Sequence, residues 1–362
     1  MKQVTIIAGA RPNFMKIAPI IHEIINLREV GTAIDYRLIH TGQHYDKNMS
    51  GDFFEQLEIP PPNNNLECGG GSQAVQTANI MIAFEKELEE NPTDLVLVVG
   101  DVTSTMACAI VAQKSHTKVA HVEAGIRSLD WSMPEEINRL VTDSITNYFF
   151  TTSKTANQHL KESGVDKENI YFVGNTMIDT LLKQRPNFIK PQLWNDLKLQ
   201  TKNYCVITLH RPANVDEEYK LKELINEIIV NSENMPLVFP MHPRTAAIFK
   251  RLKINHPRLH ILPPLSYLEF NYLVERSKVV ITDSGGITEE TTVMGVPCMT
   301  LRDNTERPET ILEGTNELIG TDSKAIAPAF IKLLSNKWKV GKVPELWDGK
   351  TAKRIVDILT KI

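Results

Sequence analysis

Short apolar runs alternate along this chain with longer stretches in which apolar residues recur at helical spacing. One run, DLVLVV at 94–99, is apolar after its first residue, as is typical of a strand buried on both faces of a parallel sheet. The apolar runs predict strands at 3–8, 36–41, 94–99, 119–122, 148–151, 170–173, 204–209, 236–240, 260–262, 279–282 and 298–301. The helical spacing predicts helices at 13–27, 73–90, 103–114, 134–146, 154–163, 220–231, 244–253, 267–277, 287–294, 323–334 and 351–362.

This alternation predicts the α/β class, with parallel sheets covered by helices on both faces. A charged segment with a proline at 184–199 interrupts the pattern, which then restarts, and 362 residues exceed the size of one compact core. We therefore expect two Rossmann-like, doubly wound domains at 1–173 and 174–350, with the helix at 351–362 packing back on the first. Two such domains would face each other across a central cleft, where open α/β sheets bind ligands.

Composition and charge narrow the possible partners. A hydrophobic content of 42% and a charged content of 23% are typical of a soluble globular protein. The net charge of −4 and the pI near 6.2 give no electrostatic reason to expect binding to nucleic acid or to an anionic membrane. No apolar run approaches the roughly 20 residues that span a bilayer, and the N-terminal residues have the pattern of a first strand and not of a signal peptide.

Two further features concern the loops and the cysteines. The segment 60–72 is rich in Pro, Asn and Gly, which predicts a mobile surface loop. The cysteines are widely spaced, without a C-x-x-C pair, so we expect reduced thiols in a cytoplasmic protein and neither disulfides nor a zinc site. They are Cys68, Cys108, Cys205 and Cys298.

The stretch VVITDSGGITEE at 279–290 predicts a strand, a tight turn and the start of a helix. Gly295 would end that helix, because glycine readily adopts the left-handed conformation found after helix C-termini. A turn that leads into a helix N-terminus exposes backbone N–H groups at the positive end of the helix dipole. Ser284, Gly285 and Gly286 are therefore candidate ligands of a phosphate or diphosphate, although an ordinary βα turn has the same pattern.

Polar residues follow several of the predicted strands. Asp101, Glu123 and His210 each come directly after a strand, and Glu135 lies at the start of a helix. The carboxyl ends of parallel strands meet at one edge of a sheet, so these side chains are expected to converge. Carboxylates that converge in one cleft push each other's pKa values apart, which supplies an acid and a base at neutral pH.

Each of these residues also has a structural alternative. Asp101 could cap the helix that follows it. Ser132-x-x-Glu135 fits a capping box, and His210 could be a hydrogen-bonded core histidine. Arg139 could simply be the ion-pair partner of a carboxylate of the PEE sequence one turn away.

Other side chains are suited to bind a nucleotide. Glu290 could accept hydrogen bonds from ribose hydroxyls or be a solvated helix residue, and Phe270 could stack on a base or belong to the core. The chain has no G-x-G-x-x-G followed by an acid, no GxxxxGK[ST] and no convincing metal-ligand spacing, so we expect neither a cofactor nor a metal. The basic side chains that could face an anion are Arg11, Lys16, His242 and Arg307.

A set of motifs resembles one known family. GARPNFMKIAP, TGQHYD, GDVTSTMA, HVEAGIRS, MPEEINR, GNTMIDTL, LHRPAN, HP, TDSGGITEE and TERPE occur in the order found in the non-hydrolysing UDP-N-acetylglucosamine 2-epimerases. The resemblance spans essentially the whole chain. It implies a two-domain fold like that of the GT-B glycosyltransferases, a homodimer, no metal or nicotinamide, and inversion of C2 of UDP-GlcNAc to give UDP-ManNAc for surface polysaccharide precursors.

The resemblance also implies roles for individual residues. The family eliminates UDP to leave 2-acetamidoglucal and then adds UDP back, with the proton delivered to the opposite face of C2. Asp101 and Glu135 match the residues for the two C2 proton transfers, and His210 matches the residue that stabilises the departing phosphate; Glu123 belongs to the same catalytic set. Phe270, with the backbone around Leu265, matches the uracil pocket. The other substrate-binding positions are Arg11, Lys16, Arg139, His242, Ser284, Gly285, Gly286, Glu290 and Arg307.

One departure from the family concerns regulation. Many bacterial members are activated by a second substrate molecule, which they bind through a Gln-His-x-x-Gln-type loop and a following Arg-Gln pair. This chain has Gln43 and His44 but Asp46, and GGGS at 69–72 stands where the basic segment would lie. The sequence therefore predicts hyperbolic kinetics without activation by substrate.

Four other functions fit parts of this pattern. A hydrolysing epimerase would share the fold and the first half-reaction, and a relative could act on a 2,3-diacetamido uronic-acid nucleotide. A GT-B glycosyltransferase would share the phosphate site but has no need for acids on both faces of C2. A non-catalytic nucleotide-sugar sensor would not need the acids Asp101, Glu123 and Glu135.

Overall fold

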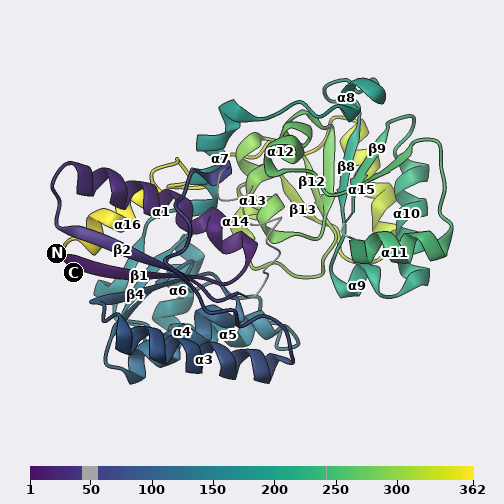
Figure 1. The fold of residues 1–362 in the computed structure, drawn as a ribbon. Coiled ribbons are helices and arrows are strands. Elements are labelled where there is room, and N and C mark those ends of the chain that lie inside the picture. The colour runs from purple at the N-terminus through teal and green to yellow at the C-terminus, as the bar shows by residue number, and fades with distance from the viewer. Residues whose placement is uncertain (43–55, 242) are drawn as a thin grey trace. The chain divides into compact units, whose positions relative to one another are not determined.

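The computed structural model describes residues 1–42, 56–241 and 243–362, and the chain divides into two compact units. The first unit comprises Met1–Thr180 and Glu345–Ile362, and the second comprises Leu181–Pro344. Each unit has a parallel sheet with helices on both faces (Figure 1). The predicted α/β class with parallel sheets is confirmed.

The first sheet has seven strands in the order β3-β2-β1-β4-β5-β6-β7. All five side chains of β4 are buried because helices cover both faces of the sheet. The strands are β1 (Lys2–Ala8), β2 (Ile34–His40), β3 (Asn64–Asn65), β4 (Leu95–Val99), β5 (Lys118–Val122), β6 (Tyr148–Thr151) and β7 (Ile170–Phe172). The helices are α1 (Arg11–Glu29), α3 (Gln73–Glu90), α4 (Thr103–Lys114), α5 (Pro134–Ser144), α6 (Lys154–Glu162), α7 (Thr176–Gln184) and α16 (Thr351–Leu359).

The C-terminal segment returns to the first unit. Helix α16 packs against α1, and Figure 1 shows the yellow α16 beside the purple α1 although they lie at opposite ends of the chain. The backbone N–H of Ala352 donates to Asp179 Oδ2 (2.7 Å), and Trp347 Nε1 donates to the carbonyl of Thr152 (3.0 Å). These contacts fix the last residues to the strand ends and to α7 within this unit.

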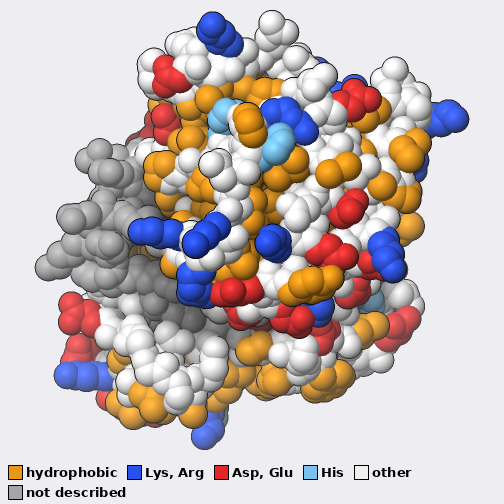
Figure 2. Space-filling model, turned by 90° about the vertical axis from the view of Figure 1, so that its right-hand side faces the viewer, with side chains coloured by type: hydrophobic (Ala, Val, Ile, Leu, Met, Phe, Trp, Pro, Cys, Tyr) orange, Lys and Arg blue, Asp and Glu red, His pale blue; other side chains and the backbone are white. Residues whose placement is uncertain are grey.

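The second sheet has six strands in the order β10-β9-β8-β11-β12-β13. Its strands are β8 (Cys205–Thr208), β9 (Leu237–Pro240), β10 (Leu259–Leu262), β11 (Val279–Thr282), β12 (Cys298–Thr300) and β13 (Asn316–Leu318). Its helices are α8 (Leu193–Asp196), α9 (Pro212–Val215), α10 (Glu218–Asn231), α11 (Pro243–Leu252), α12 (Tyr267–Arg276), α13 (Gly285–Met294), α14 (Pro308–Leu312) and α15 (Ile326–Leu334). Short 3₁₀ helices lie at Lys167–Asn169, Arg185–Asn187 and Ser323–Ala325. On the face of the molecule in Figure 2, acidic and basic side chains are interspersed.

The segment 60–72 is largely irregular and exposed, as predicted for a surface loop, but its middle forms the edge strand of the first sheet. Asn64–Asn65 form β3, which pairs in parallel with β2. Asn63 Oδ1 accepts the backbone N–H of Leu38 (2.8 Å), and the side chain of Cys68 is buried. The asparagines that suggested a loop thus serve as hydrogen-bonding groups along the sheet edge.

The described part of the chain, which lacks 43–55 and 242, contains no helix that is both long and apolar enough to cross a membrane.

Candidate functional site

Two of the candidate carboxylates lie at one edge of the first sheet. Strand β4 ends at Val99 and leads through Gly100 to Asp101, and the paired strand β5 ends at Val122 and leads to Glu123. Gly100 has a φ of +69°, and a Cβ atom there would lie 3.1 Å from Lys16 Nζ and 3.3 Å from Glu123 Oε2. Glycine is therefore required at this turn both for its backbone conformation and for the space that the ion pair occupies.

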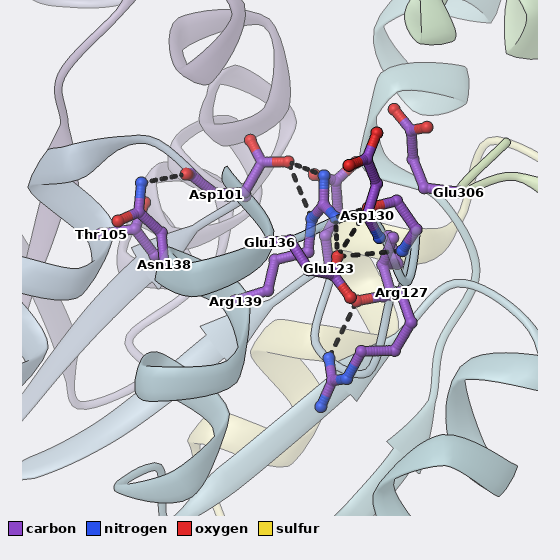
Figure 3. A network of polar contacts seen from close by, with 12 residues as sticks. Asp101, Thr105, Glu123, Arg127, Asp130, Glu136, Asn138, Arg139 and Glu306 are labelled. Atoms are coloured by element: carbon purple, nitrogen blue, oxygen red, sulfur yellow. Dashed lines mark hydrogen bonds and ion pairs between the residues drawn. The ribbon is translucent and has the colours of Figure 1, made fainter. Parts of the chain in front are cut away.

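Asp101 is held by the guanidinium group of Arg139. Arg139 Nε and another guanidinium nitrogen lie 3.0 and 2.9 Å from Asp101 Oδ2 (Figure 3). Asn138 Nδ2 also donates to the backbone carbonyl of Asp101 (2.9 Å). The N-cap of α4 is Val102 and no side chain caps that helix, so the helix-capping alternative for Asp101 was wrong. The paired guanidinium favours the ionised form of the aspartate.

Glu136 links this pair to the preceding loop, and its ion pair with Arg139 confirms the predicted pairing of that arginine with the PEE sequence one turn away. Its side chain is 1% exposed, and it accepts hydrogen bonds from the backbone N–H and hydroxyl of Ser128, both at 2.9 Å. It also receives the backbone N–H of Leu129 (3.1 Å) and an ion pair from Arg139. Arg139 is buried between Glu136 and Asp101, which is the geometry of a group that orients the aspartate (Figure 3). The adjacent PEE glutamates gave no signal to distinguish Glu136.

Glu123 is buried and forms an ion pair with Lys16. Its φ of +70° is in the left-handed region, which is uncommon for residues other than glycine. Such conformations cost energy and persist where the surroundings impose them, as they often do at functional sites. Lys16 is on α1, whose first residue is Arg11, so both predicted basic groups belong to the helix that follows β1.

Glu135 lies in the first turn of α5, and its side chain is partly exposed. No hydrogen bond or ion pair joins it to another residue of the described ranges. The N-cap of α5 is Met133, without a side-chain cap, and the hydroxyl of Ser132 donates to Asp130 (2.6 Å). The capping-box alternative for Glu135 was therefore wrong.

A second buried network supports the same sheet edge and was missed from the sequence. His121 Nδ1 lies 2.8 Å from Asp143 Oδ1, and His121 Nε2 lies 2.8 Å from the carbonyl oxygen of Gly100. Burial alone would raise the pKa of Asp143, but His121 and Arg127 hold that pKa below its ordinary value. This network fixes the turn from which Asp101 projects.

In the second unit, the sequence around Ser284 forms the predicted helix N-terminus. Ser284 is the N-cap of α13, and the helix begins at Gly285, two residues earlier than predicted. Gly285 and Gly286 therefore occupy the first helical turn, where backbone N–H groups have no partner within the helix. Gly295 ends the helix with a φ of +68°, as the sequence predicted.

His210 lies in the loop that follows β8, the strand paired with β11, and it contacts Asp283 just before this helix N-terminus. Its side chain is 56% exposed, so the core-histidine alternative was wrong. Its Nδ1 lies 2.8 Å from Asp283 Oδ1. Asp283 is the residue between β11 and Ser284, and sequence analysis treated it only as part of the turn. An Asp placed between a strand and a Ser-Gly-Gly turn was the available signal.

Two arginines and a glutamate also lie near the start of α13. A Cβ atom on Gly285 would lie 3.2 Å from Glu306 Oε1. Glu306 Oε2 forms an ion pair with Arg302, and a guanidinium nitrogen of Arg211 lies 3.6 Å from Glu306 Oε1. Burial alone would raise the pKa of Glu306, but the two arginines and Arg307 lower it to about 2. The arginines bring positive charge to the proposed anion site, and the sequence analysis named neither of them.

Glu290 is buried, which excludes the alternative of a solvated helix residue. The hydroxyl of Tyr267 donates to Glu290 Oε1 (2.7 Å), and burial raises the pKa of Glu290 to about 7. Arg307 is ion-paired with Glu289 on the same helix. Phe270 and Leu265 are partly buried and pack against one core cluster. The site residue His242 lies outside the described residues, as do Gln43, His44 and Asp46.

The described residues contain no group of three or more His, Cys, Asp or Glu side chains that could hold a metal ion. The chemical groups at hand are carboxylates in the first unit and an imidazole, arginines and a helix N-terminus in the second. Such a set can move protons and bind a phosphorylated anion.

Comparison with known proteins shows which family the chain belongs to. A sequence model described as UDP-N-acetylglucosamine 2-epimerase matches residues 28–360. The chain is 40% identical to a UDP-N-acetylglucosamine 2-epimerase of Methanocaldococcus jannaschii, covering 99% of each chain. It is 36% identical to a UDP-2,3-diacetamido-2,3-dideoxy-D-glucuronate 2-epimerase of Pseudomonas aeruginosa, covering 100% of each.

A solved structure gives the same result for the fold. The crystal structure of the Methanocaldococcus jannaschii UDP-GlcNAc 2-epimerase in complex with UDP-GlcNAc and UDP superimposes with a TM-score of 0.88 at 38% identity. The match covers 99% of this chain and 100% of that one. From the family match, the relatives and the fold together, the chain belongs to the UDP-N-acetylglucosamine 2-epimerase family.

Proposed function

We propose that this epimerase reversibly converts UDP-N-acetylglucosamine to UDP-N-acetylmannosamine by inverting C2. The observation that carries the proposal is the family relationship over the full chain, at 40% identity to a named UDP-GlcNAc 2-epimerase. The ordered carboxylates at the ends of β4 and β5 and in α5 support it. We place the reaction in the cytoplasm, in agreement with the four free, buried cysteine thiols, where it supplies a surface-polysaccharide precursor.

The proposed chemistry is an elimination followed by re-addition. The C2 proton is not adjacent to a carbonyl group of the ring, so simple deprotonation and reprotonation is not feasible. Instead, a carboxylate removes the C2 proton while the C1–O bond breaks. The electron pair of the C–H bond forms the C1–C2 double bond, and that of the C1–O bond goes to the β-phosphate oxygen. UDP then adds back to 2-acetamidoglucal while a proton reaches the opposite face of C2. Asp101 and Glu135 serve the two faces, and the Lys16–Glu123 pair lies beside them at the sheet edge.

The second unit retains the leaving UDP. The N–H groups at the start of α13 and the positive end of its dipole bind the diphosphate. Glu290 accepts hydrogen bonds from the ribose hydroxyls, and Phe270, with the backbone around Leu265, contacts the uracil. Arg307, which is ion-paired with Glu289 of α13, adds positive charge in this unit.

Incubation with UDP-GlcNAc in D₂O, followed by NMR of the sugar, tests this function. We expect UDP-ManNAc with deuterium at C2, in equilibrium with labelled UDP-GlcNAc. Free ManNAc and UDP would assign the protein to the hydrolysing branch of the reaction. The proposed function would be excluded if the protein gave no turnover and no deuterium label, both with UDP-GlcNAc and with the second candidate substrate described in the next paragraph.

The relationship to the Pseudomonas aeruginosa enzyme supports a second candidate substrate. That relative is named for a UDP-2,3-diacetamido-2,3-dideoxy-glucuronate, and it matches the whole chain at 36% identity. The same C2 inversion would then act on a sugar with an acetamido group at C3 and a carboxylate at C6. Parallel assays with both nucleotides compare kcat/KM directly, and the larger value identifies the substrate.

We also propose a homodimer, formed through the outer surface of the first unit. Helices α3, α4 and α5 line a groove of about 400 Å³ there. Its apolar lining includes Met81, Met106 and Ile137, and Ile82 nearby on α3 is 69% exposed. Contiguous apolar surface of this kind marks association sites. Analytical ultracentrifugation should show a dimer, which Ile82→Glu together with Ile137→Glu should dissociate.

A further inference from the structure

Asp283 connects the two parts of the phosphate-binding half-site, and the proposed mechanism so far gives it no role. It follows the last residue of β11 and precedes Ser284, the N-cap of α13. Its side chain is fully buried. A carboxylate is rarely buried unless its charge is compensated, so its partners show what it does.

The partners of the Asp283 side chain lie in the segment that follows β8, from His210 to Asn214 in α9. Its Oδ2 accepts the backbone N–H of Arg211 (2.9 Å), that of His210 (3.1 Å) and the Nδ2 group of Asn214 (3.0 Å). Its Oδ1 lies 2.8 Å from Nδ1 of His210. Arg211 Nε in turn donates to the backbone carbonyl of Asp283 (3.0 Å). One residue thus fixes both the path of the loop and the orientation of the imidazole ring.

The carboxylate is ionised in these surroundings. Burial alone would raise the pKa of Asp283, but the bonds from His210, Asn214 and Arg211 hold that pKa below its ordinary value. An ionised carboxylate only accepts hydrogen bonds, so Nδ1 of His210 must carry the proton between them. The other ring nitrogen, Nε2, is then directed away from Asp283 on a side chain that is 56% exposed.

We propose that Asp283 is a positioning residue that keeps His210 protonated on Nδ1 and fixes the orientation of its ring, so that Nε2–H donates to the departing diphosphate. This inference rests on the proposed elimination of UDP. As the C1–O bond breaks, its electron pair passes to the β-phosphate oxygen, which accepts a hydrogen bond from Nε2–H. In the re-addition the same oxygen re-forms the C1–O bond and releases that hydrogen bond, so the imidazolium is unchanged over the cycle.

The physical reason is the charge of the partner. A carboxylate beside Nδ1 fixes the ring orientation and accepts a hydrogen bond from the protonated nitrogen. A neutral amide in its place would remove that charge and allow the other tautomer, whose Nε2–H donates without the full positive charge. Asp283 is also joined directly to the cap of α13, so the imidazole and the helix N–H groups are held by adjacent residues of one strand end.

The kinetic test is a double-mutant cycle with Asp283→Asn, His210→Gln and the double variant. We expect Asp283→Asn to lower kcat by about 100-fold or more, with KM for UDP-GlcNAc changed by less than about threefold. If Asp283 acts through His210, adding Asp283→Asn to His210→Gln should cost less than about threefold more. Two losses that multiply independently would overturn the proposal.

A matched control measures the purely structural part of the effect. Thr208 Oγ1 and Thr282 Oγ1 form a buried hydrogen bond (2.6 Å) between the same two strands, just before His210 and Asp283. Thr208→Val removes that bond without touching either residue. We expect this variant to lose stability in a thermal melt while its kcat stays within about threefold of the parent. A loss of kcat like that of Asp283→Asn would contradict a specific role for the carboxylate.

An NMR measurement tests the pair independently of catalysis. Long-range ¹H–¹⁵N correlation spectra of protein labelled with ¹⁵N-histidine, assigned by comparison with His210→Gln, report which ring nitrogen of His210 carries a proton. We expect a protonated, hydrogen-bonded Nδ1 in the parent and a loss of that signal in Asp283→Asn. A ring with an unprotonated Nδ1 in the parent would exclude the proposal even if the enzyme epimerises its substrate. If the parent protein gave the expected spectrum but did not epimerise its substrate, the proposed reaction would be excluded and the contact between Asp283 and His210 would stand.

Discussion

The carboxylates proposed for catalysis in the first unit and the carboxylate proposed for ribose binding in the second unit have different partners. In the first unit, Glu123 is paired with Lys16 and Asp101 with Arg139, so full negative charges are placed beside full positive charges. In the second unit, Glu290 accepts a hydrogen bond from the neutral hydroxyl of Tyr267, and burial raises its pKa to about 7. Glu309 on α14 is similar, because burial raises its pKa to about 7 in spite of the nearby Arg307.

This difference separates chemistry from recognition. A base that removes a carbon-bound proton must be ionised and aimed, and a neighbouring cation supplies both conditions at some cost in basicity. A carboxylate that receives ribose hydroxyls need only be buried and oriented, and it is free to change its protonation state near neutral pH. The sharpest tests of the comparison therefore change a charge in one unit and ask whether catalysis or stability responds.

The largest effect is expected from Asp101→Asn, which removes the paired carboxylate but keeps its shape. We expect kcat to fall by at least about 10³-fold, because general acid–base catalysis typically contributes 10²–10⁴-fold. Deuterium incorporation at C2 should fall in parallel. Asp35→Asn, which breaks the exposed pair with Arg28 in the same unit, is the matched control and should stay within about twofold. Equal losses of kcat in the two variants would show that removing any carboxylate charge from the first unit lowers catalysis.

A smaller loss is expected from Glu136→Gln, which removes the second ion-pair partner of Arg139. The guanidinium would then lose the carboxylate that fixes the side away from Asp101, and the orientation of Asp101 would become less precise. We expect kcat to fall by about 10–100-fold with KM nearly unchanged, since a misplacement of about 1 Å can cost 10²-fold. Ser144→Ala, which removes an exposed hydrogen bond to the carbonyl of Val141 at the end of the same helix, controls for general effects on α5. A rise in KM with unchanged kcat would instead indicate that Arg139 contacts substrate directly.

The sequence was sufficient for the fold because most strands are continuous apolar runs. Strand β4 is buried at each position, and its pattern has no alternative interpretation. The missed strands are short and polar, and the helices α7, α8, α9 and α14 were missed as well. Strand β3 consists of two asparagines, and β13 is the sequence NEL, whose middle residue is charged. Their structure depends on hydrogen bonds to a neighbouring strand that is distant in sequence, and local pattern does not carry that information.

The residues of the candidate site could be predicted from the sequence only where they follow an apolar strand. Residues at the ends of apolar strands, such as Asp101, Glu123 and His210, follow from the topology of a parallel sheet. Their supporting partners do not: Glu136, Asp143 and Asp283 are ordinary acidic residues in the sequence, and only the folded chain shows which charges they meet. The capping and core alternatives failed for the same reason, because hydrogen-bond geometry decides between them.

The pH dependence of stability tests how burial acts on carboxylates of the second unit without an activity assay. The carboxyls of Glu290 and Glu309 have pKa values raised from 4.5 to about 7, so between those pH values the folded state binds more protons than the unfolded state. Their contribution to stability is therefore complete below about pH 4.5 and is lost as the pH rises through 7. At about 1.4 kcal/mol per pKa unit, the loss is roughly 3 kcal/mol for each group.

Denaturant titrations of the parent and of Glu309→Gln from pH 5 to 8 measure this contribution. The parent should lose stability with rising pH, and the variant should show a smaller slope. Glu306 is the matched control: its pKa is lowered to about 2, so its contribution is present above pH 4.5 and is lost as the pH falls through 2. Glu306→Gln should leave the slope from pH 5 to 8 unchanged. A parent slope of zero or of the opposite sign would contradict this effect of burial on the carboxylates of the second unit.

The last prediction concerns the saturation curve for substrate, for which we expect no cooperativity. A curve without cooperativity would agree with one nucleotide site per chain. An activating site would need basic side chains at 69–72, where this chain has GGGS. Gly70 and Gly71 have φ values of +82° and +84°, so arginine or glutamine there would be strained. We therefore expect initial rates with UDP-GlcNAc to follow a hyperbola with a Hill coefficient close to 1, in the forward and the reverse direction. A clearly sigmoidal curve would mean that a second nucleotide regulates the chain, and recognition would then not be confined to the site built around α13.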